Sequence, residues 1–131
     1  MKTIRVLFID DDQSSRLLAE AVFKHAKFDV ALAADAQEAE KILLERSFDV
    51  IVCDVMMPGE NGIDFCRRIK QSGNKTPFLF LSALDGAKLV SQGLMIGAMA
   101  YLYKPFDPME LPRKILALVE QNSSARQEPS I

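Results

Sequence analysis

The sequence predicts a three-layer α/β/α sandwich built on a five-stranded parallel sheet. Short apolar runs of strand length alternate along the chain with segments of helical periodicity, which gives five β-α units. Residues 50–53 are apolar at every position, a pattern typical of a parallel strand covered by helices on both faces. Because crossovers between parallel strands are right-handed, the helices divide between the two faces. We infer the strand order 2-1-3-4-5, in which the first and third strands are neighbours.

The first two β-α units fill the N-terminal part of the chain. Residues 4–9 form an apolar strand, and a helical pattern follows toward Phe28. The apolar positions that carry this helical pattern are Leu17, Leu18, Ala21 and Val22. A second strand, residues 30–33, precedes Asp35, and Glu38 completes a capping box. A helix is therefore predicted to begin there, and its inner positions are Ala39, Ile42 and Leu43.

The third and fourth units follow the same pattern. The third strand ends at Asp54, and a turn of proline, glycine and asparagine follows at residues 58–62. The next helix has Ile63, Cys66 and Ile69 at its inner positions. The fourth strand, residues 78–81, closes at Ser82. The helix expected after it passes through Leu89 and Val90, and it is interrupted by Gly93 and Gly97.

The fifth strand, residues 100–103, precedes the last helix. Asp107 is the expected N-cap of this helix, Pro108 its first residue, and Glu110 completes the capping box. Pro112 conflicts with this start, because proline at the fifth helical position removes a backbone hydrogen bond. We therefore expect a kink or a delayed start in this helix.

The chain of 131 residues, 49% of them hydrophobic, is long enough for one domain with its own core and too short for two. We assign residues 1–122 to this domain and residues 123–131 to a polar tail or linker, because few apolar residues follow Glu120. The 16 basic and 18 acidic residues are well mixed, which excludes a basic surface for nucleic acid. No apolar run spans a membrane and no signal peptide is recognisable, so we expect a cytoplasmic protein without membrane contact.

Polar side chains stand at the carboxyl ends of four strands. Asp10, Asp11 and Asp12 follow the first strand, Asp54 the third, Ser82 the fourth and Lys104 the fifth. Ligands of such sheets bind beyond the carboxyl ends of the strands, at the point where the strand order reverses. Since the first and third strands are neighbours in the inferred order, the carboxylates after them are expected to share one site.

Carboxylates crowded at one place repel one another, and a divalent cation that binds oxygen ligands relieves the repulsion. We expect Mg²⁺, because it needs only one or two protein carboxylates and is usually completed by phosphate oxygens. Lys104 and the Ser82 hydroxyl would then bind the remaining oxygens of a phosphoryl group. Asp54 can act as the nucleophile, which gives an aspartyl phosphate.

Taken alone, each of these residues has a simpler explanation as a helix cap, a local backbone partner or a solvated surface charge. The combination of four fitting residue types at four strand ends favours the functional interpretation. Cys53 and Cys66 lack C-x-x-C spacing and are expected to be core residues. His25 is expected at the border or surface of the first helix and is assigned no role.

Four stretches of the sequence resemble motifs of the response-regulator receiver family of two-component signal transduction. They are VLFIDDDQSSR, DVIVCDVMMPGENGIDFCRRIK, PFLFLSA and AYLYKPFDPMEL. Their order and spacing also match, from Ile4 to about Val119. The resemblance implies a phosphoacceptor that is not an enzyme, and whose output face changes conformation when it is phosphorylated. It also implies that Asp54 accepts the phosphoryl group, that Asp11 binds Mg²⁺ directly, and that Asp10 does so mainly through water, with the Met56 carbonyl as a further ligand.

The resemblance implies three further roles. Ser82 would bind the phosphoryl group, Lys104 would pair with it, and Tyr101 would be an aromatic switch that turns inward as Ser82 shifts. A cis peptide bond before Pro105 would direct Lys104 into the site. Met99, Ala100 and Pro112 depart from the family pattern on the output side. A sensor histidine kinase or a phosphotransfer protein would be the phosphodonor, while an effector domain beyond the C-terminus and a homodimer formed on phosphorylation stay open.

The main alternative is a phosphatase similar to the haloacid dehalogenase superfamily, whose nucleophile and acid/base are two aspartates separated by one residue, as Asp10 and Asp12 are. Asp54 would then be an accessory residue. The receiver interpretation is favoured because the residues after Asp54 and around Lys104 match receivers and the chain has no room for a cap domain. A degenerate receiver that serves only as a binding scaffold is disfavoured, because no expected site residue is missing.

Overall fold

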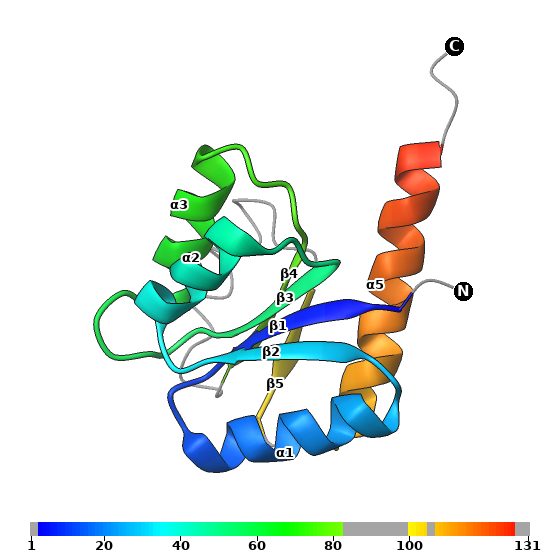
Figure 1. Cartoon of the computed structure of the whole chain (residues 1–131), viewed down its shortest axis with the longest axis horizontal. Helices are drawn as coiled ribbons and strands as arrows, with labels where there is room; N and C mark the ends of the chain where they lie inside the picture. The colour runs from blue at the N-terminus through cyan, green and yellow to red at the C-terminus, as the bar shows by residue number, and fades with distance from the viewer. Residues whose placement is uncertain (1–2, 83–99, 105–106, 128–131) are drawn as a thin grey trace.

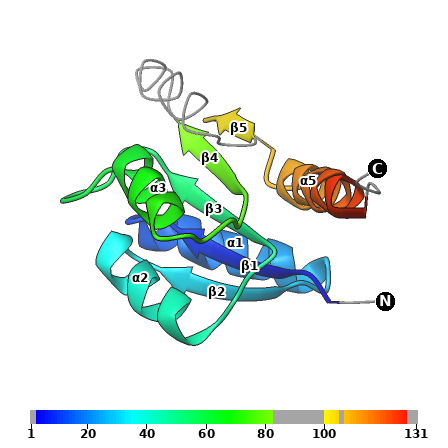
Figure 2. The same ribbon diagram turned by 90° about the horizontal axis from the view of Figure 1, so that it is seen from above.

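The computed structural model describes residues 3–82, 100–104 and 107–127, and it has the predicted layers (Figure 1). One five-stranded parallel sheet has the order β2-β1-β3-β4-β5, which Figure 2 shows from above. The strands are β1 (Arg5–Ile9), β2 (Asp29–Ala33), β3 (Val50–Asp54), β4 (Phe78–Ser82) and β5 (Ala100–Tyr103). The predicted fold class and strand order are confirmed, and the arrangement is flavodoxin-like.

Helices cover both faces of the sheet. Those that the structure describes are α1 (Gln13–His25), α2 (Ala36–Glu45), α3 (Gly62–Gln71) and α5 (Glu110–Gln127). Figure 1 shows α2 and α3 on one face and α1 and α5 on the other. Alternate strand residues therefore enter different apolar layers: Leu7 and Ile9 pack with α2 and α3, and Val6 and Phe8 pack with α1 and α5. This burial on both faces explains why residues 50–53 are all apolar.

Of the four apolar positions that carry the predicted helical pattern of α1, the structure buries only Val22. Leu17 and Leu18 are 59% and 52% exposed, and Ala21 is exposed as well. The residues that α1 buries are Ala19, Val22 and Phe23, which follow the i, i+3, i+4 spacing of one helix face. Because α1 has apolar residues on two sides, periodicity alone does not decide which side meets the sheet.

The predicted start of α2 and the predicted inner positions of α2 and α3 are confirmed. The Asp35 side chain caps α2 by accepting a 2.8 Å hydrogen bond from the Glu38 amide. Ala39 is buried in the layer between α2 and the sheet, and Ile42 and Leu43 pack against that layer. The residues Ile63, Cys66 and Ile69 of α3 are buried in the same layer. Cys53 and Cys66 are free and buried, and burial raises the pKa of each thiol, as expected for inert core residues.

The last helix begins later than its capping pattern predicts. The Asp107 side chain accepts a 3.0 Å hydrogen bond from the Met109 amide, but α5 begins only at Glu110. Pro112 is then the third helical residue, where no intrahelical partner exists for an amide hydrogen, so the delayed start accommodates it. The helix continues to Gln127, past Glu120, where low apolar content predicts a tail. Low apolar content indicates little burial, and it does not prevent a polar segment from being helical.

Two expectations fall outside the described residues: the helix through Leu89 and Val90, and the peptide bond before Pro105. Within the described part of the chain, the helices are too short or too polar to cross a membrane.

Candidate functional site

The loop after β1 is held by hydrogen bonds that fix Asp10. The Asp10 amide donates to the Ala33 carbonyl over 3.1 Å, which continues the contact between β1 and β2 by one residue. The Asp12 amide donates to Asp10 Oδ1 over 3.0 Å. Asp10 is buried as a result, whereas Asp11, the next residue, is exposed.

Asp12 caps α1. Its Oδ2 accepts hydrogen bonds from the Ser15 amide over 3.1 Å and from the Ser15 hydroxyl over 2.8 Å. The hydrogen bonds from the side chain and the backbone of Ser15 lower the pKa of Asp12, so this carboxyl group stays ionised. A low pKa and a capping role both oppose its use as a general acid. The geometry therefore gives no support to a phosphatase that relies on Asp12.

Asp54 ends β3 with a side chain that is almost enclosed. The residue is 7% exposed, and its Oδ1 accepts a 3.1 Å hydrogen bond from the Met56 amide. The first residue of α3, Gly62, lies directly behind it, where a Cβ atom would come within 2.3 Å of the Asp54 carbonyl oxygen. Only glycine allows α3 to begin this close to Asp54. The packing of α3 against β3 and the position of Asp54 therefore both depend on Gly62.

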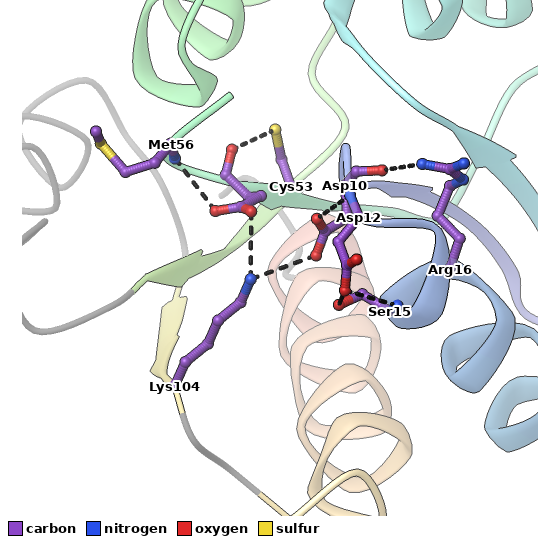
Figure 3. A network of polar contacts seen from close by, with 8 residues as sticks. Asp10, Asp12, Ser15, Arg16, Cys53, Met56 and Lys104 are labelled. Atoms are coloured by element: carbon purple, nitrogen blue, oxygen red, sulfur yellow. Dashed lines mark hydrogen bonds and ion pairs between the residues drawn. The ribbon is translucent and has the colours of Figure 1, made fainter. Parts of the chain in front are cut away.

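Lys104 follows β5 and joins the two buried carboxylates. Its Nζ lies 3.2 Å from Asp54 Oδ2 and 3.4 Å from Asp10 Oδ2, and Figure 3 shows the side chain extending toward Asp10. Burial of the ammonium group favours its neutral form, but attraction to Asp54 and Asp10 outweighs burial and raises the pKa of Lys104. Lys104 is therefore a permanent positive charge inside this site.

Burial has the opposite effect on Asp54. It raises the pKa of this carboxyl group to about 6, the attraction of Lys104 opposes that rise, and repulsion from Asp10 adds to it. The positive charge of Lys104 thus compensates only part of the cost of burying the Asp54 carboxylate. Another cation in the site would favour the ionised form further.

Asp10, Asp11 and Asp54 form the acidic cluster that a cation would need. Each contributes one carboxylate oxygen, and these oxygens all lie within 4.8 Å of one another. An oxygen-only donor set with two buried members and one exposed member suits Mg²⁺, which retains several water ligands. The described residues therefore fit a Mg²⁺ site, and Asp11 marks its open side.

Ser82 and Lys104 lie on neighbouring strand ends. Ser82 is buried at the end of β4, and its carbonyl accepts a 2.7 Å hydrogen bond from the Lys104 amide. Tyr101 lies on β5, paired in register with Phe80 of β4. Its half-buried ring packs against the apolar layer shared with α2 and α3, and the ring of Tyr103 lies 5.1 Å away.

Two residues of the site escape sequence reasoning. Arg16 donates a 2.8 Å hydrogen bond from Nη1 to the Asp10 carbonyl, and no periodicity or spacing indicates such a contact. Gly62 could have been noticed, because a glycine in the first turn of a predicted helix replaces a better helix former. Apart from Asp12, which caps α1, the structure brings together the strand-end residues that the sequence predicts: Asp10, Asp11, Asp54, Ser82 and Lys104.

Comparison with known proteins identifies the family. The sequence pattern of the family described as the response regulator receiver domain matches residues 6–116. This chain belongs to that family. The response regulator MprA of Mycobacterium sp. strain KMS is 35% identical over 120 residues, which cover 92% of this chain and 52% of that protein. The transcriptional regulatory protein TrcR of Mycobacterium tuberculosis is 36% identical over 120 residues, which cover 92% of this chain and 47% of TrcR.

The receiver domain of the Francisella response regulator 1452 is similar in structure. It has a TM-score of 0.84 and 32% identity, with 92% of this chain and 99% of that chain covered. This chain spans about half the length of MprA and TrcR. It is the receiver domain of a response regulator, a signalling protein, and the comparisons do not support the phosphatase alternative. Receiver domains generally use Mg²⁺ at an acidic site, and this receiver has an aspartate cluster of that kind.

Proposed function

We propose that Asp54 is the phosphoacceptor of this receiver and that Asp10, Asp11, Asp54 and the Met56 carbonyl hold Mg²⁺. The observation that supports this assignment is the meeting of three carboxylates with Lys104, whose Nζ contacts the two buried ones. Asp54 is the acidic residue at the end of the central strand β3, and it faces both the cation cluster and Lys104.

The reaction forms one bond and breaks one. An Asp54 carboxylate oxygen attacks the phosphorus atom of the donor, and the bond from phosphorus to the donor nitrogen or oxygen breaks. Mg²⁺ held by Asp10, Asp11 and Asp54 would reduce the repulsion between these carboxylates and the incoming phosphoryl oxygens. The Lys104 ammonium, now beside Asp54, pairs with a phosphoryl oxygen, and the Ser82 hydroxyl donates to another.

The phosphoryl group changes the shape of the output face through β4 and β5. Ser82 moves toward the phosphoryl oxygen, and Tyr101 turns inward into the space beside it. The domain modifies itself once and does not turn over a diffusible substrate, so it acts as a switch and not as an enzyme.

The phosphodonor in this scheme is a sensor histidine kinase or a phosphotransfer protein, and the protein acts in the cytoplasm. TrcR is a transcriptional regulatory protein, and by analogy an effector domain receives the signal from this receiver. In this proposal residues 1–122 form the receiver and residues 123–131 are a polar tail or linker.

Labelling with acetyl phosphate tests the assignment of Asp54. In the presence of Mg²⁺, mass spectrometry should show the addition of one phosphoryl group, and chelation with EDTA should abolish it. Asp54→Asn should not be labelled, whereas Asp12→Asn, which alters only the cap of α1, should be labelled as the wild type is. Retained labelling of Asp54→Asn, with the phosphoryl group mapped to Asp10, would contradict the proposed function.

A further inference from the structure

Arg16 contacts the backbone of the site from the side opposite Lys104. It is the fourth residue of α1, and its Nη1 donates the 2.8 Å hydrogen bond to the Asp10 carbonyl. Figure 3 shows the guanidinium group on one side of Asp10 and the Lys104 side chain on the other. The carbonyl belongs to the peptide group that joins Asp10 to Asp11. Arg16 thus holds the link between two members of the acidic cluster.

The orientation of this peptide group determines where Asp11 points. Rotation of the group changes ψ of Asp10 and φ of Asp11, and it moves the Asp11 side chain relative to Asp54. The Asp10 amide is already fixed by Ala33, and Asp10 Oδ1 accepts from the Asp12 amide. Among the described residues, Arg16 is the hydrogen-bond donor to the Asp10 carbonyl. Without Arg16, the carbonyl of this peptide group would lose the hydrogen bond that fixes its orientation.

We propose that Arg16 is a positioning residue for the cation site. By holding the Asp10 carbonyl, it keeps the carboxylate of Asp11 directed toward those of Asp10 and Asp54. This inference rests on the proposed function of the acidic cluster as a Mg²⁺ site.

Charge and positioning predict opposite effects of Arg16 on Mg²⁺ binding. Among the ion pairs between described residues, none includes Arg16, and its recorded contact is to a neutral carbonyl. As a bare positive charge near the site, Arg16 would repel Mg²⁺, so its removal would tighten Mg²⁺ binding. As a positioning residue, it supports the site, so its removal weakens Mg²⁺ binding.

Calorimetric titration of the unphosphorylated protein with MgCl₂ separates the two roles. Arg16→Met removes the donor and the charge but keeps an apolar stem, and Arg16→Lys keeps the charge but loses the planar guanidinium group. We expect the Kd for Mg²⁺ to rise about fivefold in Arg16→Met, which corresponds to the loss of one hydrogen bond, and to rise in Arg16→Lys as well. Arg67→Met is the matched control, because Arg67 is a half-buried arginine of α3 that pairs with Asp64 and has no recorded contact with the acidic cluster among the described residues. Its Kd should stay within about 1.5-fold of the wild-type value.

The dependence of phosphorylation on Mg²⁺ gives a second measurement. In Arg16→Met, the Mg²⁺ concentration for half-maximal labelling should rise about fivefold, while the rate at saturating Mg²⁺ stays within about twofold of the wild-type rate. A lower Kd in Arg16→Met, or an unchanged Kd in both Arg16 variants, would overturn the proposal.

Circular dichroism in EDTA shows whether the variants fold. If Arg16→Met is unfolded, Arg16→Lys decides the question, and if both are unfolded, Arg16 serves the fold and the proposal is wrong. Failure of Asp54 labelling in the wild type would contradict the proposed function, whereas an unchanged Mg²⁺ affinity in folded Arg16 variants would contradict only the role of Arg16.

Discussion

Replacement of Asp54 by asparagine should stabilise the metal-free protein at neutral pH. Burial raises the pKa of Asp54 to about 6 in the folded chain, and its ordinary value is 3.8. The pKa of Asp54 is higher in the folded chain than in the unfolded chain, so the unfolded chain loses this proton first as the pH rises. Between the two pKa values, each increase in pH therefore favours unfolding. The contribution of Asp54 to stability is therefore fully present below pH 3.8 and is lost as the pH rises through about 6. Asparagine has a similar shape and no such titration.

The size of the effect follows from the two pKa values. A difference of about two units corresponds to about 3 kcal/mol once both states are ionised, near pH 7.5. At pH 4 the same two values leave about 0.5 kcal/mol. The folded pKa of Asp54 already includes the attraction of Lys104, so the loss of this contact in the variant is part of the same difference and is not subtracted again. We therefore expect Asp54→Asn to gain about 3 kcal/mol in free energy of unfolding at pH 7.5 and less than about 1 kcal/mol at pH 4.

Urea unfolding in EDTA, followed by circular dichroism at both pH values, measures this difference. Glu45→Gln is a suitable control, because Glu45 is an exposed carboxylate at the end of α2, and its stability should change by less than about 0.5 kcal/mol. Addition of Mg²⁺ should reduce the advantage of Asp54→Asn, because the wild type gains a cation ligand that the variant lacks. If Asp54→Asn is less stable than the wild type at pH 7.5, or if its advantage is the same at pH 4, burial does not control the ionisation of Asp54.

Two further substitutions test the surroundings of Asp54. Gly62→Ala should lower the free energy of unfolding by about 1–3 kcal/mol, because its Cβ would lie 2.3 Å from the Asp54 carbonyl oxygen. In Gly59→Asn, a control at an open site with φ of 76°, the loss measured by urea unfolding should be under about 1 kcal/mol; equal losses would show that the approach of α3 to Asp54 is not critical. Met56→Asn should speed the release of phosphate from the phosphorylated protein at least about threefold, because an amide can hold the attacking water and a thioether cannot. Met56 is 54% exposed, so the change should leave the fold intact, and a release rate as slow as that of the wild type would exclude control by water access.

The strand-end residues could be selected from the sequence because two regularities act together. An apolar run shows where a buried strand ends, and parallel strands bring their carboxyl ends to the same edge of a sheet. Asp10, Asp54 and Lys104 stand at the ends of three such runs. In the structure, Lys104 Nζ lies 3.4 Å from Asp10 Oδ2 and 3.2 Å from Asp54 Oδ2. No knowledge of the loops is needed for this step.

Features that depend on one particular packing arrangement could not be predicted. Leu17 and Ala19 are both apolar, and only the packing of α1 on the sheet shows that Ala19 is buried and Leu17 exposed. The contact of Arg16 with the Asp10 carbonyl depends on how the loop after β1 turns into α1. The same loop commits Asp12 to the cap of α1 and away from the acidic cluster. Contacts of side chains with backbone groups in loops leave no periodic pattern in the sequence, so sequence analysis does not predict them.

The charges of the site connect phosphorylation to β5. With Asp10, Asp11 and Asp54 ionised and Lys104 protonated, the site has a net charge of about −2, which one divalent cation balances. In the proposed reaction a phosphoryl group replaces the single charge of Asp54 with nearly two, which disturbs that balance. Among the described residues, Lys104 is the positively charged side chain that contacts Asp54, and its backbone amide donates a 2.7 Å hydrogen bond to the Ser82 carbonyl. If Lys104 moves toward the new charge, we expect the hydrogen bond from its amide to Ser82 to transmit that movement to the pairing of β4 with β5, the strand that carries Tyr101.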